Sequence, residues 1–175
     1  LAETGRGGHR TGGSLSAPAI RAFRRPAKTD VVDSTESEFV ERFVSFVRDQ
    51  GFVFDRHDLL NFHVSVKIGG LTILAGRSGT GKSSLPRLYA QSLGVSGEYL
   101  HVPVRPDWLD DRDLVGAFNV LARRFEPANS GLVEHLISAE FDQREGRGGM
   151  FLICLDEMNL ARVEHYFAQF LSVLE

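Results

Sequence analysis

The feature that most constrains this chain is a glycine-rich segment at residues 76–83, which fits the pattern G-x-x-x-x-G-K-[ST] at every fixed position. Glycines in such a segment let the backbone curl, so that successive N–H groups point at phosphate oxygens. We expect Lys82 to reach the β- and γ-phosphates of a nucleotide and Ser83 to ligate Mg²⁺. The predicted nucleotide-binding residues are Gly76, Arg77, Ser78, Gly79, Thr80, Gly81, Lys82, Ser83 and Ser84.

The elements around this segment indicate an α/β fold. Residues 71–75 form a short apolar run typical of a buried parallel strand, and residues 84–93 show helical spacing. The start of that helix faces the same anion as the loop. Strands that alternate with helices predict a parallel sheet. Further strands are expected at 99–104 and 150–155, and further helices from Thr35 to Gly51, at 55–68, from Leu132 to Gly146 and at 162–175.

Two stretches fit these patterns less well. Residues 55–68 fit a strand as well as a helix, and we expect a helix. Residues 105–130 are expected to be irregular, with Trp108 in the core rather than at an interface. The acidic residues of this stretch are expected to form a solvated loop rather than a metal site, because nothing fixes them in a frame; they are Asp107, Asp110, Asp111 and Asp113.

An acidic pair follows the predicted strand at 150–155. Asp156 and Glu157 stand at its carboxyl end, where ligands bind in parallel α/β sheets. We expect Asp156 to hold Mg²⁺ and Glu157 to polarise an attacking water as the general base. Glu157 and Lys82 are therefore the predicted catalytic residues. The alternative is an ordinary surface pair after a buried strand.

The spacing of the two motifs makes their combination more specific than either one. Asp156 lies 73 positions after Ser83, and another predicted strand lies between them. The pair also bears on the type of reaction. Small-molecule kinases with a phosphate loop generally do not need a water-activating Glu at this point, so Glu157 favours hydrolysis over transfer to a small acceptor.

Residues 155–167 resemble the Walker B region of McrB-like AAA+ ATPases, the motor subunits of modification-dependent restriction systems in the dynein-related AAA group. The resemblance extends to residues 71–83, 102–108 and 113–116, and it runs overall from about residue 55 to residue 175. It implies the three-layer P-loop NTPase (AAA+) sandwich with a parallel sheet. It also implies that this chain is the N-terminal part of the AAA+ module, truncated after the Walker B helix.

The resemblance implies an activity and partners as well. It implies Mg²⁺-dependent hydrolysis of ATP or GTP, an EC 3.6-type reaction, by a homo-oligomeric ring that is typically a hexamer. It further implies a McrC-like nuclease subunit as a partner, and contact with DNA through the full-length protein. The sensor-1 strand, arginine finger and lid of the family are expected beyond residue 175, so this fragment alone should turn over poorly. The alternative is a nucleotide-gated assembly or binding module without efficient turnover.

The charge distribution divides the chain into a tail and a body. Residues 1–33 are expected to be a disordered, basic Gly/Ser/Arg-rich tail or linker, and residues 34–175 a partial AAA+ domain. Residues 1–28 hold six basic residues and one acid, whereas the remainder holds 14 basic and 22 acidic residues, a net charge of −8. The tail would either contact nucleic acid or be solvated. Without an aromatic platform beside the arginines, we expect the second.

The composition is that of an ordinary soluble globular protein, with 42% hydrophobic and 25% charged residues. The single cysteine, Cys154, excludes a disulfide within the chain and a cysteine zinc site, and it is expected in the core. No apolar stretch approaches the length of about 20 residues that a membrane helix needs. We therefore expect a cytoplasmic protein without a membrane partner.

A few other side chains are secondary candidates. Asn159 and Arg162 follow the acidic pair, and facing the nucleotide or a neighbouring subunit is one of two interpretations of equal weight. For Arg162 the alternative is a solvated position in the first turn of its helix. The histidines show no spacing typical of metal ligands; they include His63, His101, His135 and His165.

Overall fold

The computed structural model describes residues 35–174, so the predicted tail at 1–33 lies outside the described residues. Within that range the chain is mixed α/β with a small parallel sheet of two strands, β1 (Tyr99–Pro103) and β4 (Leu152–Asp156). In the register, Tyr99 lies opposite Leu152 and Pro103 lies opposite Asp156. The strands expected at 99–104 and 150–155 are therefore confirmed.

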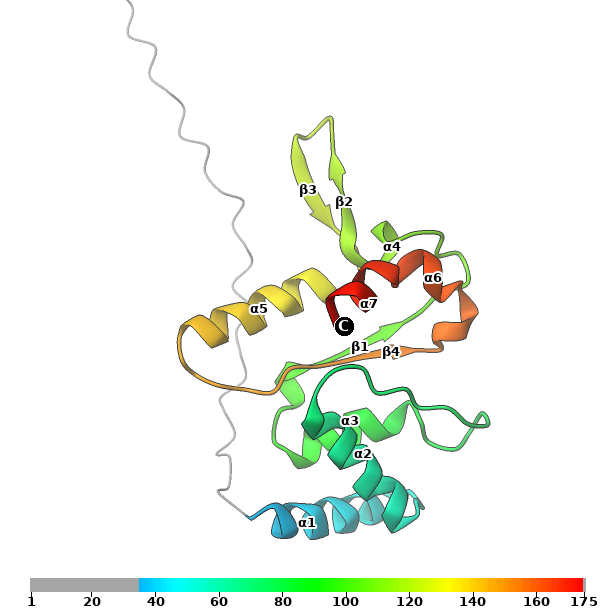
Figure 1. The fold of residues 1–175 in the computed structure, drawn as a ribbon, viewed down its shortest axis with the longest axis vertical. Coiled ribbons are helices and arrows are strands. Elements are labelled where there is room, and N and C mark those ends of the chain that lie inside the picture. Colours follow the sequence, from blue (N-terminus) through cyan, green and yellow to red (C-terminus); the bar gives the residue numbers. More distant parts are fainter. Residues whose placement is uncertain (1–34, 175) are drawn as a thin grey trace, which may run out of the picture.

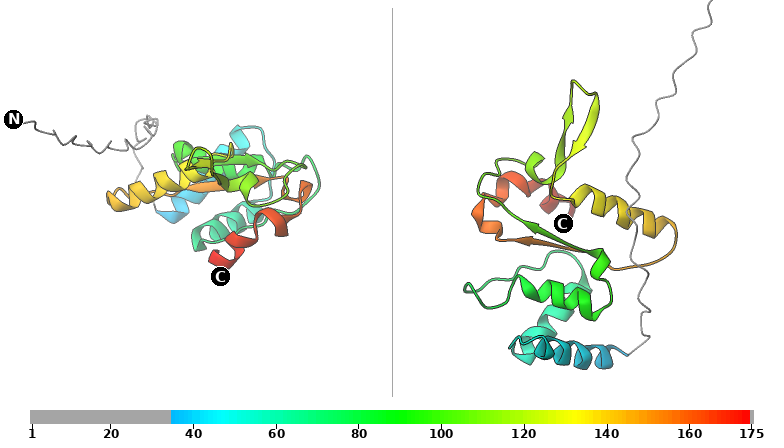
Figure 2. Two further views of the ribbon diagram at one scale, coloured as in Figure 1. Left: turned by 90° about the horizontal axis from the view of Figure 1, so that it is seen from above. Right: turned by 180° about the vertical axis from the view of Figure 1, so that it is seen from behind.

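Helical segments and a hairpin surround this strand pair. Figure 1 shows α1, α2 and α3 on one side of β1 and β4 and the later helices on the other, and Figure 2 shows the same arrangement from behind. None of the helices within the described range is both long and apolar enough to cross a membrane. The segments before β1 are α1 (Glu36–Asp49), α2 (Arg56–Ile68), α3 (Ser84–Ser92) and the 3₁₀ turn η1 (Ser96–Glu98). The later ones are α4 (Arg112–Val115), β2 (Gly116–Asn119), β3 (Arg124–Pro127), α5 (Leu132–Arg144), the 3₁₀ turn η2 (Met158–Leu160), α6 (Val163–Tyr166) and α7 (Ala168–Leu174).

The first two helices begin at side-chain caps that the sequence contains. At α1, the Thr35 side-chain oxygen accepts a hydrogen bond from the Glu38 N–H, and the Glu38 carboxylate accepts one from the Thr35 N–H at 2.9 Å. At α2, the Asp55 carboxylate accepts from the N–H of His57 at 2.7 Å. α2 ends at Gly69, so the helix expected over 55–68 is confirmed.

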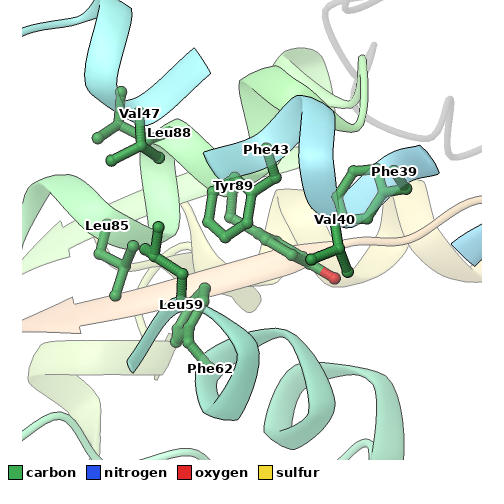
Figure 3. Packing of buried hydrophobic residues seen from close by; sticks show 9 residues of the cluster. All are labelled: Phe39, Val40, Phe43, Val47, Leu59, Phe62, Leu85, Leu88 and Tyr89. Atoms are coloured by element: carbon green, nitrogen blue, oxygen red, sulfur yellow. The ribbon is translucent and has the colours of Figure 1, made fainter. Parts of the chain in front are cut away.

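The helices α1, α2 and α3 share one hydrophobic cluster, which we call the N-terminal cluster (Figure 3). Tyr89 of α3 lies at its centre, edge-on to the rings of Phe39, Phe43 and Phe62 at 5.7, 5.2 and 5.3 Å between centroids. This packing fixes α3 against α1 and α2. The buried members are Phe39, Val40, Phe43, Val47, Leu59, Phe62, Leu85, Leu88 and Tyr89.

A second group, the C-terminal cluster, lies on the other face of the strand pair. Trp108 is buried there and meets the ring of Tyr166 edge-on at 5.2 Å, so its expected place in the core is confirmed. The Tyr166 hydroxyl also donates to the carbonyl of Met158 at 3.0 Å, which ties α6 to the turn after β4. The buried members are Val102, Val104, Trp108, Leu114, Leu132, Tyr166 and Phe167.

The prediction of a buried strand at residues 71–75 is wrong. The segment belongs to no strand, and within the described residues its N–H groups donate to no backbone carbonyl. Ile73 is 76% exposed and Leu71 45%, while Leu74 packs against the N-terminal cluster. A short apolar run becomes a buried strand only where neighbouring strands accept and donate its backbone hydrogen bonds, and here no described strand lies beside it.

The stretch 105–130 is more ordered than expected. It contains the short helix α4 and an antiparallel hairpin, in which Gly116 of β2 lies opposite Pro127 of β3. The hairpin extends away from the rest of the chain in Figure 1. A side chain at Gly116 would bring a Cβ within 2.3 Å of the Glu126 carbonyl oxygen, so the close approach at the hairpin base requires glycine. The four-residue turn at 120–123 has none of the Asn-Gly or Asp-Gly pairs that identify a hairpin in a sequence.

The single helix expected over 162–175 is interrupted. α6 ends at Tyr166 and α7 begins at Ala168, and Phe167 stands between them as a turn residue with φ −119° and ψ −6°. Both Tyr166 and Phe167 are buried in the C-terminal cluster. Their apolar spacing continues across the break, so periodicity alone does not reveal it.

Candidate functional site

The predicted phosphate loop curls around its own Arg77 carbonyl. That oxygen accepts hydrogen bonds from Thr80 Oγ1 at 2.9 Å and from Lys82 Nζ at 2.5 Å, so the Lys82 ammonium lies inside the loop. Gly79 and Gly81 have φ values of +79° and +85°. L side chains rarely adopt this conformation, and the turn therefore needs glycine at both positions.

The helix α3 begins directly at the end of this loop. The Gly81 carbonyl accepts from the N–H groups of Ser84 and Leu85, each at 3.0 Å. The N–H groups of Gly81, Lys82 and Ser83 donate to no backbone carbonyl within residues 35–174, and such groups at a helix N-terminus bind anions. Of the predicted nucleotide-binding residues, the half-buried ones are Gly81, Lys82 and Ser84, and the exposed ones are Gly76, Arg77, Ser78, Gly79, Thr80 and Ser83.

A hydrogen bond joins the two predicted motifs. Ser83 is the N-cap residue of α3, yet its side chain makes no capping bond. Instead, Ser83 Oγ donates to Asp156 Oδ1 at 2.8 Å, across 73 positions of sequence. The main chain of Asp156 is fixed at the same point, because its carbonyl accepts from the Val104 N–H at 3.0 Å. The structure therefore brings the loop and the carboxyl end of β4 together.

The Asp156 carboxyl group is held in its ionised form. Burial raises its pKa, but hydrogen bonds from Ser83 and His101 lower it by more, so the net pKa lies below the ordinary value of 3.8. The N–H of Glu157 also donates to Asp156 Oδ1, at 3.1 Å. A hydroxyl and an ionised carboxylate are hard oxygen ligands of the kind that Mg²⁺ prefers.

Glu157 follows Asp156 in an uncommon backbone conformation, with φ +55° and ψ +42°. Its carbonyl accepts from the N–H of Leu160 at 2.9 Å as η2 begins. The Glu157 side chain is exposed, and no hydrogen bond or ion pair joins its carboxylate to the described loop residues. The structure thus places Glu157 beside the metal-ligand candidate, but it does not tie Glu157 to the loop.

Sequence reasoning missed His101 as a neighbour of the site. Its Nε2 atom lies 3.2 Å from Asp156 Oδ2. His101 stands in the middle of β1 rather than in either motif. Only the register of the strand pair shows the contact, since His101 lies opposite Cys154, two residues before Asp156.

Phe54 is a second residue that the motifs do not predict. A Cβ at Gly81 would lie 2.6 Å from Cζ of the Phe54 ring, so this ring packs directly on the loop backbone. The Phe52 ring stacks on Phe54 at 6.3 Å between centroids. The connection between α1 and α2 therefore contacts the phosphate loop, and Gly81 leaves room for the Phe54 ring.

The secondary candidates lie near the acidic pair without touching the loop residues. Asn159 is exposed in η2, and Arg162 is exposed at the N-cap of α6. The contact with the nucleotide or a neighbouring subunit stays a prediction for both. Cys154, expected in the core, is half-buried in β4, and burial raises the pKa of its thiol.

The acidic loop is stabilised internally by its own arginines. Arg112 pairs with Asp110, and Arg105 pairs with Asp107. The Asp113 carboxylate accepts from the N–H of Leu109 at 2.7 Å. These contacts order a loop that the sequence predicted to be irregular.

A hollow of about 590 Å³ lies beside the C-terminal half of α5, away from both motifs. None of the predicted phosphate-loop residues lines it, and neither does Asp156 or Glu157. It is therefore a separate feature from the candidate site. Its lining residues are Leu136, Ala139, Glu140, Asp142, Gln143, Gly146, Gly148, Gly149 and Phe151.

Comparison of the chain with protein families, with curated proteins and with solved structures found no match. The function proposed below therefore depends on the residues of the site and on their geometry.

Proposed function

We propose that this chain binds a nucleoside triphosphate with Mg²⁺ and hydrolyses it, as a P-loop NTPase of the AAA+ type. The observation that carries the proposal is the hydrogen bond of 2.8 Å between Ser83 Oγ and Asp156 Oδ1. It joins the last residue of the loop pattern to the acid at a strand end. A chance match to the loop pattern gives no reason for this particular pair to meet.

The residues present fit a magnesium-bound triphosphate. Ser83 and Asp156 would hold the ion, which neutralises charge on the phosphate oxygens when bound. Lys82 adds a positive charge inside the loop, and the N–H groups of residues 81–83 would bind phosphate oxygens. Within residues 35–174 no three His, Cys, Asp or Glu side chains gather as a metal site, so phosphate and water oxygens would complete the coordination.

Glu157 is the proposed general base. Its exposed carboxylate directly follows the metal-ligand candidate, and in this role it would take the proton of an attacking water. The proposed substrate is either ATP or GTP. The wider proposal is a ring-forming motor resembling McrB-like ATPases, typically hexameric, with a McrC-like nuclease partner and DNA contact through the full-length protein. Its support is the sequence of residues 155–167, which contains the acidic pair and continues through η2 and α6.

A nucleotide-gated assembly module without efficient turnover is the second candidate. The observation that favours it is the Glu157 side chain, whose carboxylate makes no hydrogen bond to the described loop residues. A general base needs a fixed orientation toward the water that it activates. Both candidates share nucleotide binding and differ only in turnover.

Calorimetry with ATP and with GTP, each with and without Mg²⁺, tests the binding step. We expect at least one nucleotide to bind, more tightly with Mg²⁺ than without it, and to lose this binding in Lys82→Ala, because that substitution removes the ammonium inside the loop. Lys67→Ala is the matched control, since Lys67 pairs with Glu36 near the C-terminus of α2. The proposal fails if neither nucleotide binds, or if Lys82→Ala binds as tightly as the control.

A phosphate-release assay separates the two candidates. For a hydrolase, Glu157→Gln should retain nucleotide binding and lose turnover by about 100-fold or more, because the amide cannot accept the proton. Equal turnover in Glu157→Gln and the wild type would remove the assigned role of Glu157. Tight binding with no phosphate release in the wild type would favour the assembly module.

A further inference from the structure

Asp156 lies on the face of the strand pair that turns toward α3, and Leu152 on the same face packs against the N-terminal cluster. Successive side chains of a strand point to opposite faces, and the register sets His101 opposite Cys154 and Pro103 opposite Asp156. His101, Cys154 and Asp156 therefore share one face, which lies toward Ser83 and the start of α3. On the opposite face, Leu100, Val102 and Leu155 pack in or against the C-terminal cluster, whereas Ile153 is 41% exposed.

On this face the Asp156 carboxylate is held at both oxygens. Ser83 Oγ donates to Oδ1 at 2.8 Å, and His101 Nε2 lies 3.2 Å from Oδ2. An ionised carboxylate only accepts hydrogen bonds, so His101 Nε2 carries the hydrogen of this contact. The side chains of His101 and Asp156 are 43% and 24% exposed, so solvent and ions reach the pair.

The geometry points to His101 as a positioning residue for magnesium: by binding Asp156 Oδ2, it turns Oδ1 toward the phosphate loop. This inference rests on the proposed function, because it assigns His101 a task in the same metal site. His101 does not touch the ion or the phosphates in this role. It acts only through Asp156.

The physical reason is the freedom of an aspartate side chain at a strand end. Without a partner at Oδ2, the carboxylate is held only at Oδ1, by Ser83 and the Glu157 N–H, and it can still turn about that oxygen. Ordering it then costs conformational entropy when the ion binds. Hydrogen-bond partners of metal ligands are worth about 10- to 100-fold in metal affinity. The Ser83 contact cannot replace the His101 contact, since Ser83 is itself a proposed ligand.

The test is a titration of the chain with Mg²⁺, measured by calorimetry. The chain is saturated beforehand with ATP or GTP, whichever of the two it binds. We expect His101→Ala to weaken Mg²⁺ binding by about 10-fold. Binding of the nucleotide without Mg²⁺ should change by less than about twofold, because His101 contacts no loop residue among those described. His101→Gln should restore most of the Mg²⁺ affinity, since its amide nitrogen sits at about the same distance from Cα as Nε2. His101→Asn should not restore the Mg²⁺ affinity, because the shorter Asn side chain puts its amide nitrogen where Nδ1 of His101 lies, not where Nε2 lies.

Controls separate this inference from the proposed function. His165→Ala removes an exposed histidine in α6 and should leave Mg²⁺ binding unchanged. If the wild type binds no nucleotide, the proposed function fails and this inference fails with it. If the wild type binds the Mg²⁺–nucleotide pair and His101→Ala binds Mg²⁺ equally well, only the positioning role is overturned. A similar loss of Mg²⁺-free nucleotide binding in His101→Ala would also overturn it, because that loss indicates a general structural effect.

Discussion

The two hydrophobic clusters each hold one half of the candidate site, and they are assembled in different ways. The N-terminal cluster is built from three helices between residues 39 and 89, and it supports α3, whose N-cap is Ser83. The C-terminal cluster draws on residues 102–167, from β1 through α6, and it supports the strand end that carries Asp156. The difference shows that the site belongs to neither cluster. It forms where the two meet, at the Ser83–Asp156 hydrogen bond.

The strand β4 lies between the two clusters and contacts both. Leu152 packs against the N-terminal cluster, and Leu155 packs against the C-terminal one. The clusters also differ in their polar contents. The N-terminal cluster encloses His63, whose Nδ1 lies 2.9 Å from the Tyr89 hydroxyl. In the C-terminal cluster the Tyr166 hydroxyl instead bonds a main-chain carbonyl.

The largest predicted effect tests whether the two clusters unfold together. Phe43 is fully buried in the N-terminal cluster, so Phe43→Ala should lower the free energy of unfolding by about 3 to 5 kcal/mol. Because β4 joins the clusters, the fluorescence of Trp108, the only tryptophan, should change at the same lowered urea concentration as the helical circular dichroism.

A matched substitution in the other cluster completes this test. Leu114 is also fully buried, and Leu114→Ala should lower the free energy of unfolding by about 2 to 5 kcal/mol. The Trp108 fluorescence and the helical circular dichroism should again change at the same urea concentration. If Phe43→Ala shifts the helical signal while the Trp108 transition stays at its wild-type position, the clusters are independent and the role given to β4 is wrong.

A smaller effect should distinguish the polar contacts of the clusters. Tyr89→Phe leaves the buried His63 Nδ1 without its partner, so we expect a loss of about 1 to 3 kcal/mol. Tyr166→Phe removes a bond to the Met158 carbonyl in a part-buried position, and the expected loss is about 0.5 to 1.5 kcal/mol. Urea unfolding of both variants measures the difference. A larger loss in Tyr166→Phe would contradict this comparison.

The smallest predicted effect is a pH dependence at the junction of the clusters. The pKa of Asp156 in the folded chain lies below its ordinary value, so ionised Asp156 stabilises the fold above that ordinary value. This contribution is lost as the pH falls through the lowered pKa. The urea midpoints of the wild type and of Asp156→Asn should therefore differ more at about pH 7 than at about pH 3. If the difference between the two urea midpoints does not change with pH, the Asp156 charge does not stabilise the junction.

Local patterns predicted most of the helices and both parallel strands, for reasons that particular residues make clear. The capping box at Thr35 and Glu38 and the stop at Gly69 act within a few residues, so the ends of α1 and α2 can be read from the sequence. The hairpin at 116–127 and the break at Phe167 could not be predicted this way. The hairpin turn lacks the Asn-Gly or Asp-Gly pair that identifies many hairpins in a sequence. The apolar spacing of the helix expected over 162–175 continues across the break.

By itself, the sequence determined which residues the candidate site has to offer: a glycine-rich loop with its lysine and serine, and an acidic pair after an apolar strand. Both of these motifs consist of residues that are close together in the sequence, so the local backbone alone brings their members together. Only the tertiary structure decided that Ser83 and Asp156 meet, that His101 holds the second Asp156 oxygen, and that residues 71–75 form no strand. These outcomes depend on strand register and on long-range packing, and no local pattern specifies which distant segments become neighbours.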